Sequence, residues 1–231
     1  MTPQRDAGAG FERLNRELTE CRRCPRLVAW RERVAREKRA AFRHETYWGR
    51  PVPGFGDPAA RLLILGLAPA AHGGNRTGRV FTGDRSGDWL FASLWRTGFA
   101  NQPTSVARDD GLTLSGCYVT APVKCAPPDN KPLPAERDNC APWLERELAL
   151  LAPTVRVVVA LGGYAWDIAL RHLGPVRPKP RFSHGAESPL PEGRVLLGSF
   201  HVSQQNTATG KLTEPMLDAV FLRARELLGG A

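Results

Sequence analysis

The segment RLLILGLAPAAHGGNRTGRVFTGD, residues 61–84, decides the fold class. It opens with a short apolar run, Arg61–Leu67, and a loop rich in Gly, Pro and Ala follows directly. A run of this length is typical of a strand that is buried on both faces of a parallel sheet. The segment therefore predicts a buried strand, followed by a loop whose small residues let backbone N–H groups approach a ligand closely.

Three further apolar runs predict strands, at Cys117–Lys124, Val155–Leu161 and Arg194–Phe200. Before, between and after these runs the pattern predicts helices. They are one or two over Phe11–Arg39, then Asp88–Gly98 with Ser86 as its cap, Pro134–Leu151, a helix through Trp166 and Leu170, and Glu214–Leu228. Residues 103–113 and 175–191 are polar or proline-rich and are predicted to be exposed loops. This alternation predicts an α/β fold, a three-layer sandwich with a central four-stranded parallel sheet, built as a single domain over residues 1–231.

The charge balance favours an acidic partner. The chain of 231 residues has 32 Lys and Arg against 23 Asp and Glu, a net charge of +9, and only five of the cations are lysines. A field of this sign attracts polyanions and is a first indication of nucleic-acid binding. The skew towards arginine has a second explanation, codon bias, so charge alone leaves the partner open.

No targeting or membrane segment is predicted. The N-terminal residues lack the apolar core of a signal peptide, and the longest apolar run, near 62–71, is far shorter than the roughly 20 residues that span a bilayer. We therefore expect a cytoplasmic, nucleoid-associated protein without a membrane partner, and a monomer. In that compartment the five cysteines are expected to be reduced thiols or metal ligands.

Three polar loops follow predicted strands, where ligands gather in parallel α/β folds. They are residues 66–84, residues 124–132 with Asn130, and residues 201–211 with His201. The first contains no G-x-G-x-x-G, which excludes a dinucleotide fingerprint. An amide reads a base edge well, and a histidine donates to a developing anion. The alternatives are a glycine-rich turn, a turn asparagine and a structural histidine.

Four of the cysteines have a spacing that favours an iron–sulfur cluster. Cys21 and Cys24 form a C-x-x-C, whereas Cys125 and Cys140 are separate. One such pair with two single cysteines differs from the two pairs of a zinc ribbon and fits four thiolates around a [4Fe–4S] cluster. The alternative is a set of buried free thiols. Cys117 lies within a predicted strand and is interpreted as a core residue.

Five blocks in this order resemble the uracil-DNA glycosylase superfamily, in particular its iron–sulfur-containing prokaryotic branch. They are the C-x-x-C at 21–24, YWGRPVPGFGD at 47–57, GLAPAAHGGNRTGRVFTGD at 66–84, VKCAPPDNKP at 123–132 and HVSQQNT at 201–207. Together they cover most of the chain, and their separations make the resemblance specific.

Within this branch the chain resembles family 5 more than family 4. Family 4 has GEAPG in the first motif, where this sequence has Leu67 in place of the glutamate. Ala121 replaces the family 4 asparagine after the second strand, and HPSP becomes His201-Val202-Ser203-Gln204. All three departures are those of family 5.

The resemblance implies a monofunctional DNA glycosylase with a uracil-DNA glycosylase-like fold. Such an enzyme flips a damaged nucleotide out of the duplex and cuts its N-glycosidic bond, leaving an abasic site. The implied substrates are uracil, hypoxanthine and xanthine in double- or single-stranded DNA. The implied cofactor is a [4Fe–4S] cluster on Cys21, Cys24, Cys125 and Cys140, which would tie the N-terminal helical segment to the second-strand loop.

The resemblance also suggests roles at the site. His201 would donate to O2 of the departing uracil anion, and Asp84 would stabilise the cationic sugar or position water, although a helix-capping role for Asp84 is the alternative. Asn130 would bond the base edge and contribute to catalysis. Gly66, Ala68 and Phe81 would complete the base pocket, with Phe81 stacking on the base. The space vacated in the duplex would be filled by Gln204, Gln205, Asn206 and Thr207.

Two other functions remain open on the sequence. The first is a family 4-like glycosylase restricted to uracil, which a hypoxanthine substrate would separate from family 5. The second is a non-catalytic iron–sulfur protein that binds damaged DNA, which an assay for abasic sites would identify.

Overall fold

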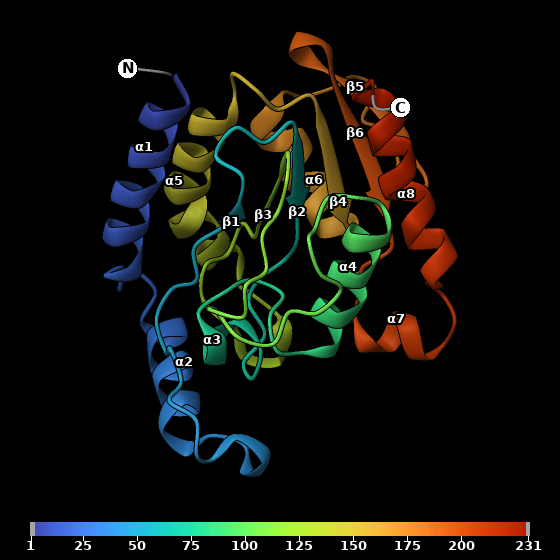
Figure 1. The fold of residues 1–231 in the computed structure, drawn as a ribbon. Helices are drawn as coiled ribbons and strands as arrows, with labels where there is room; N and C mark the ends of the chain where they lie inside the picture. Colours follow the sequence, from blue (N-terminus) through green and yellow to red (C-terminus); the bar gives the residue numbers. More distant parts are fainter. Residues whose placement is uncertain (1–2, 230–231) are drawn as a thin grey trace.

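The structure of the chain is a computed structural model that describes residues 3–229 (Figure 1). Six strands form one sheet in the order β1-β3-β2-β4-β6-β5. Its centre is four parallel strands: β3 (Cys117–Thr120), β2 (Leu62–Leu65), β4 (Val157–Leu161) and β6 (Arg194–Ser199). The predicted parallel centre is confirmed.

The apolar runs form central strands because both faces of the sheet are covered. Every residue of β2, β3 and β4 is buried. In register, Leu62 lies opposite Cys117 on one side and Val157 on the other. Alternate side chains therefore point into two separate apolar layers, and a polar residue at any of these positions would need a buried partner.

Helices cover both faces, which confirms the three-layer sandwich (Figure 1). On one face lie α1 (Pro3–Thr19), α5 (Pro134–Leu151) and α6 (Gly163–Leu173), and their apolar layer includes Leu14, Leu144 and Trp166. On the other face lie α4 (Arg85–Arg96) and α8 (Glu214–Leu227), whose layer includes Phe91 and Phe221.

The remaining helices and turns lie outside the two helix layers. They are α2 (Pro25–Glu37), α3 (Gly74–Thr77), α7 (Gln204–Ala208) and the 3-10 turns Ala40–Phe42, Pro128–Asn130 and Pro191–Gly193. The turn Pro191–Gly193 connects β5 to β6 at the amino end of β6. In Figure 1, α2, α3 and α7 all lie towards the lower end of the molecule. Among the described residues, no helix combines the length and the apolar character that a membrane span requires.

Several boundaries differ from the prediction. Two antiparallel edge strands, β1 (Phe55–Gly56) and β5 (Glu187–Leu190), were not predicted. The strand β5 falls in the segment predicted to be a loop, because Pro189 interrupts its pattern and an edge strand tolerates proline. The helix α4 begins at Arg85 with Asp84 as its cap, so the expectation that Ser86 caps it was wrong.

Candidate active site

The three polar loops meet at a cavity of about 400 Å3 at the carboxyl ends of the strands. The wall after β2 runs from Leu67 to Ala70, and the chain directly after β3 contributes Ala121. Asn130 comes from the turn further along the loop after β3, and the start of α4 with the residues before it and the chain after β6 complete the lining, with Val80, Phe81, Asp84, Arg85, Ser86, His201, Ser203 and Gln204. The predicted gathering of these loops is therefore present in the structure.

Phe81 is held in the cavity wall by an unusual backbone and by Gly66. Its φ of 50° lies in the left-handed region, which costs a bulky residue energy and is found where the surroundings impose it. A Cβ on Gly66 would come within 2.7 Å of Phe81 Cζ, so only glycine leaves room for the ring. Gly66 does not line the cavity itself and acts by admitting Phe81, whose ring centroid lies 6.3 Å from that of His201.

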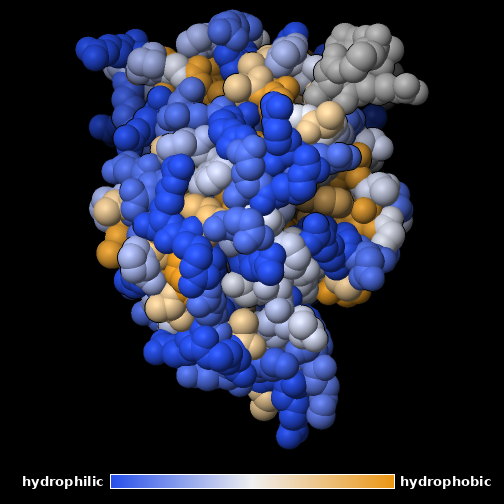
Figure 2. Space-filling model, turned by 90° about the vertical axis from the view of Figure 1, so that its left-hand side faces the viewer, coloured by the Kyte–Doolittle hydropathy of each residue, from blue (hydrophilic) through white to orange (hydrophobic). Residues whose placement is uncertain are grey.

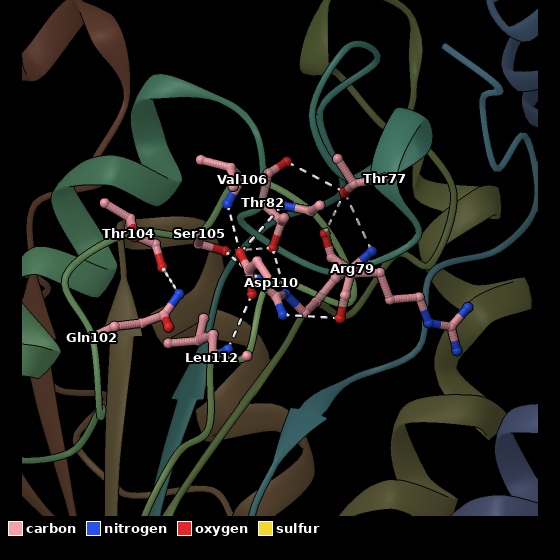
Figure 3. A network of polar contacts seen from close by, with 12 residues as sticks. Thr77, Arg79, Thr82, Gln102, Thr104, Ser105, Val106, Asp110 and Leu112 are labelled. Atoms are coloured by element: carbon pink, nitrogen blue, oxygen red, sulfur yellow. Dashed lines mark hydrogen bonds and ion pairs between the residues drawn. The ribbon is translucent and has the colours of Figure 1, made fainter.

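A buried arginine fixes the segment that carries Phe81 and Asp84 (Figure 3). Arg79 is 3 % exposed and donates to both carboxylate oxygens of Asp110 at 2.8 Å. It also donates to Thr82 Oγ1 at 2.9 Å and Ser105 Oγ at 3.0 Å. One guanidinium nitrogen, Nη2, lies between both carboxylate oxygens, and a buried charge-assisted pair of this kind restricts the position of both side chains. The residue 103–113 loop is thus anchored at its centre rather than simply exposed as predicted.

Asp84 combines the two roles that the sequence left as alternatives. As the cap of α4, its Oδ1 accepts the Gly87 N–H at 3.0 Å, and its carboxyl group also lines the cavity. Burial raises the pKa of Asp84, while the Gly87 and Ser86 N–H groups oppose this shift. Because a capping carboxylate is held in one orientation, the helix presents Asp84 to the cavity at a defined position.

His201 lies on the cavity wall directly after β6 as a neutral imidazole. Burial lowers its pKa from 6.5 to about 4, so the ring is uncharged at neutral pH. Its backbone carbonyl accepts the Asn206 amide at 2.8 Å, and its Cβ stands 3.3 Å from the position of a Cβ on Gly162. The close approach of Gly162 and the bond from Asn206 hold the histidine from both sides.

Asn130 and Ala68 complete the set of expected pocket residues. Asn130 is exposed at the rim, with a φ of 55°, a conformation that asparagine tolerates better than most residues. Ala68 lines the cavity and also packs against the apolar cluster that contains Cys24, Cys125 and Cys140. The active-site wall and the cysteine cluster therefore share one residue.

Sequence reasoning missed three polar lining residues, Arg85, Ser86 and Ser203. Ser86 was assigned to capping, but Asp84 is the cap of α4 and Ser86 lines the cavity. Ser203 caps α7, where it accepts from Asn206 N at 3.4 Å. The position of Arg85 could have indicated its role. A helix that follows a parallel strand begins at the carboxyl edge of the sheet, so residues in the first turn of α4 lie near the ligand site.

Over residues 53–225 the chain matches the family profile of the uracil DNA glycosylase superfamily. It belongs to this superfamily. A type-5 uracil-DNA glycosylase of Mycobacterium bovis is 58 % identical over 217 residues, 94 % of this chain and 81 % of the relative. One from Thermus thermophilus is also 58 % identical, over 92 % of this chain and 95 % of the relative.

The comparisons place the chain within type 5 of the uracil-DNA glycosylases. The type-5 relative from Pyrobaculum aerophilum is 48 % identical over 90 % of this chain. In contrast, a type-4 relative from Sulfurisphaera tokodaii is 26 % identical over 71 % of it. This agrees with Leu67 and Ala121, which depart from the family 4 pattern, and confirms the resemblance to family 5.

In this uracil-DNA glycosylase family member, residues 204–207 form most of the short helix α7 rather than a loop. Gln204 and Gln205 are exposed and Asn206 is partly exposed, with its amide engaged by His201. Thr207 is buried, and its hydroxyl donates to the Ser203 carbonyl at 3.2 Å. In this structure the Thr207 side chain therefore stabilises the helix, and its entry into the duplex stays a prediction.

The four cysteines expected to bind a cluster are brought together from three segments. Cys21 and Cys24 both precede α2, with Cys24 at its N-cap; Cys125 follows β3, and Cys140 lies on α5. All four line one small cavity, and the last three are buried in one apolar cluster. In the described part of the chain, no three His, Cys, Asp or Glu side chains are placed to hold a metal ion. Cys117 is fully buried within β3, as expected.

A buried guanidinium beside these sulfurs bears on whether the donor set fits a cluster. Arg31 is 2 % exposed; it donates to Cys125 Sγ at 2.9 Å and to the Cys21 carbonyl at 3.1 Å, while its Nε has no partner. Burial raises the pKa of Cys125 to about 11, and Arg31 opposes this shift. A buried cation calls for a negative partner, and four thiolates around a cluster would supply one. The donor set thus fits the implied group.

Proposed function

We propose that the chain is a monofunctional DNA glycosylase of base excision repair that removes uracil, hypoxanthine and xanthine from DNA. One observation carries the proposal: a carboxylate, Asp84, and a neutral imidazole, His201, line a single cavity large enough for a base. Family membership supports the glycosylase chemistry. The range of bases that are excised has to be argued from the residues of this chain.

His201 would act on the departing base. When the bond to N1 of uracil breaks, negative charge gathers on O2, and a fixed donor there lowers the barrier. A neutral imidazole with a pKa of about 4 donates this hydrogen bond without first needing a proton. Phe81, held against Gly66, would stack on the flipped base beside the histidine.

Asp84 would act on the sugar side of the same bond. Loss of the base leaves an oxocarbenium-like sugar, which a nearby carboxylate stabilises directly or by orienting water. The cap bond to Gly87 holds the carboxylate in place, and the anchored Arg79 holds the segment that precedes it. Together these contacts would provide the preorganisation that charge stabilisation requires.

Broad specificity is supported by the absence of polar side chains at two positions of the cavity wall. Leu67 and Ala121 line the cavity where family 4 places a glutamate and an asparagine. A pocket built to hydrogen-bond one base rejects others strongly, because unmatched bases leave its polar groups unpaired. Apolar side chains at both positions carry no such penalty. Asn130 can both donate and accept at the rim, which suits uracil and hypoxanthine alike.

We also propose that Cys21, Cys24, Cys125 and Cys140 hold a [4Fe–4S] cluster. When bound, such a cluster would supply a covalent cross-link between α2, the loop after β3 and α5. The negative sulfurs would offset the buried charge of Arg31. Ala68, which packs on this cluster of cysteines, would then support the cavity wall from behind.

The test is a single-turnover assay on duplexes that carry one uracil, hypoxanthine or xanthine each. Abasic products are revealed by alkaline cleavage, and untreated strands should stay intact. Excision of all three bases is expected. Excision of uracil alone would identify the family 4-like function, and tight binding to lesions without any abasic product would identify the non-catalytic function.

A further inference from the structure

A strongly basic arm projects beside the active site. We define the arm as residues 22–50, which contain α2, the 3-10 turn Ala40–Phe42 and the chain that returns from it. It has ten Lys and Arg against three Asp and Glu, so it carries +7 of the chain's net charge of +9. In Figure 1 the arm extends from the lower end of the molecule, where α3 and α7 also lie.

Part of this charge has no partner within the protein. Arg22, Arg26 and Arg50 pair with Glu32, Glu136 and Glu20, respectively. Among the described residues, by contrast, no carboxylate forms an ion pair with four exposed arginines of the arm: Arg33, Arg36, Arg39 and Arg43. Such unpaired guanidinium groups are available to an anion from outside.

The arm also contains a groove whose lining suits phosphate. The groove has a volume of about 550 Å3 and is lined by Arg26, Ala29, Trp30, Glu32, Arg33 and Arg36 of α2, together with Pro128; the Glu32 carboxylate is paired with Arg22. Arg33 lies 4.7 Å over the Trp30 ring, which restricts the guanidinium. The exposed guanidinium groups of Arg33 and Arg36 are the donors that phosphate oxygens accept from most readily.

The groove leads to the active site. Pro128 opens the 3-10 turn that ends at Asn130, and Asn130 stands on the rim of the cavity. A polyanion lying in the groove therefore passes within one short turn of the base pocket. The two sites are neighbours on the surface although α2 and His201 are far apart in the sequence.

The arm is braced against the loop that carries Asp84. Tyr47 Oη and His72 Nδ1 lie 3.0 Å apart, and Gly49 N donates to the Asn75 carbonyl at 3.0 Å. Asn75, fully buried, donates from Nδ2 to the Arg31 carbonyl at 3.2 Å. These contacts join both sides of the arm to residues 72–75. A ligand held by the arm is therefore held in a fixed relation to the catalytic loop.

We propose that the arm binds the sugar–phosphate backbone of the duplex that flanks the excised nucleotide, an inference that rests on the proposed function. Contacts to phosphates set the register of a protein on DNA, and the arm would thereby place the lesion over the cavity. An anionic membrane is disfavoured, because a membrane-binding helix exposes an apolar face. Leu27, Val28 and Val34 of α2 are buried, and Figure 2 shows a mainly hydrophilic surface on the projecting part.

The experiment compares two triple variants of the whole protein with equal loss of charge. The first is Arg33→Gln, Arg36→Gln and Arg39→Gln. The control is Arg13→Gln, Arg61→Gln and Arg156→Gln, three exposed arginines of which Arg61 and Arg156 lie at the amino ends of β2 and β4. Affinity for an undamaged duplex is measured between ~50 and ~200 mM salt, so the readout does not depend on excision.

In the arm variant we expect at least tenfold weaker binding at the low salt concentration, and a slope of log affinity against log salt smaller by about 2 to 3. The control should keep the wild-type slope and the wild-type rate of excision at saturating protein. Equal slopes for the arm variant and the wild type would overturn the inference, as would an equal loss in the control. The single Arg33→Gln and Arg36→Gln variants give the same test should the triple variant fail to fold. A wild type that binds in this manner without excising any base would refute the proposed function and leave the arm as a DNA-binding surface.

Discussion

Gly73 and Asp84 are in such close contact that a Cβ on Gly73 would lie 1.8 Å from Asp84 Oδ2. No side chain fits at position 73 while the carboxylate keeps its place. Gly73 precedes α3, and Asp84 caps α4, so the contact joins the middle of the loop at residues 66–84 to its last residue. At residue 73 the loop therefore requires glycine, because only glycine lets the backbone pack directly against the Asp84 carboxylate.

Gly73→Ala should slow uracil excision by roughly tenfold or more, because the new methyl group displaces Asp84 from the cavity wall, and small displacements of a catalytic group are costly. The measurement is the single-turnover rate at saturating protein. Gly8→Ala is the matched control, since a Cβ at Gly8 meets no atom within 4 Å. In the background of Asp84→Ala, Gly73→Ala should add little further loss. Full additivity of the two changes would show that Gly73 acts through something other than Asp84.

His201→Ala should reduce the single-turnover rate on uracil by about 100-fold or more, because it removes the donor to the departing anion. Asp84→Ala should have a smaller effect, since it acts on the sugar or on water. His44→Gln, at an exposed histidine of the arm, is the control and should retain the wild-type rate at saturating protein. A wild-type rate in His201→Ala on every substrate would place the catalytic centre elsewhere.

The lowered pKa of His201 predicts how stability depends on pH. Burial moves this pKa from 6.5 to about 4, so between these values an unfolded histidine binds a proton that the folded one does not. Folding stability is therefore full above about pH 6.5 and is progressively lost as the pH falls towards 4. The pKa of Asp84 is raised, so its contribution to folding stability instead falls as the pH rises from the unfolded pKa of this group to the folded one.

Urea unfolding at pH 7 and pH 5 measures this effect. The wild type should lose about 1 kcal/mol more stability between the two conditions than His201→Gln, after allowance for the partial exposure of the ring. His44→Gln should lose as much stability as the wild type. An equal loss in wild type and His201→Gln would mean that the buried site does not disfavour the charged imidazole.

The sequence predicts the centre of this fold well, because burial on both faces leaves a continuous apolar signal in β2, β3 and β4. It predicts the edge strands of the sheet poorly. In β5 only alternate residues are buried, and Pro189 within the strand is the mark of a loop in most contexts. The strands also end earlier than their apolar runs, at Leu65, Thr120 and Ser199, and two of the remaining residues, Leu67 and Ala121, line the cavity.

The sequence predicts those site residues that come directly after a strand. It does not predict the hydrogen bonds that join loops distant in the sequence. His201, Asp84 and Asn130 reach one cavity because parallel strands end at one edge. The bond between Arg79 and Asp110 joins loops 31 residues apart, and nothing in either loop indicates it. The burial of Thr207 likewise depends on the geometry of α7, which a five-residue segment does not reveal.

The cluster proposal predicts iron in the purified protein and a dependence of that iron on Arg31. Purified without oxygen from a host supplied with iron, the wild type should be brown with about four irons per chain. Arg31→Met should retain less iron, because it removes the cation that donates to Cys125 Sγ. Arg33→Met, on the exposed side of the same helix, is the control and should keep the wild-type iron content. Stoichiometric zinc without iron would refute the cluster, and full iron in Arg31→Met would refute the role of the arginine.

Asn130→Ala should change which base is accepted more than it changes the rate of chemistry. The amide stands at the rim, where it can bond a base edge, and a lost bond of this kind alters discrimination by roughly 1 kcal/mol or more. We expect the ratio of uracil to hypoxanthine excision, measured at single turnover, to shift by about tenfold. Asp129→Ala is a close control, because Asp129 is also exposed, has a φ of 54° and does not line the cavity. The backbone strain of an alanine in the left-handed region is thus common to both variants. Equal losses on the two bases in Asn130→Ala would show that the amide positions the nucleotide without reading its edge.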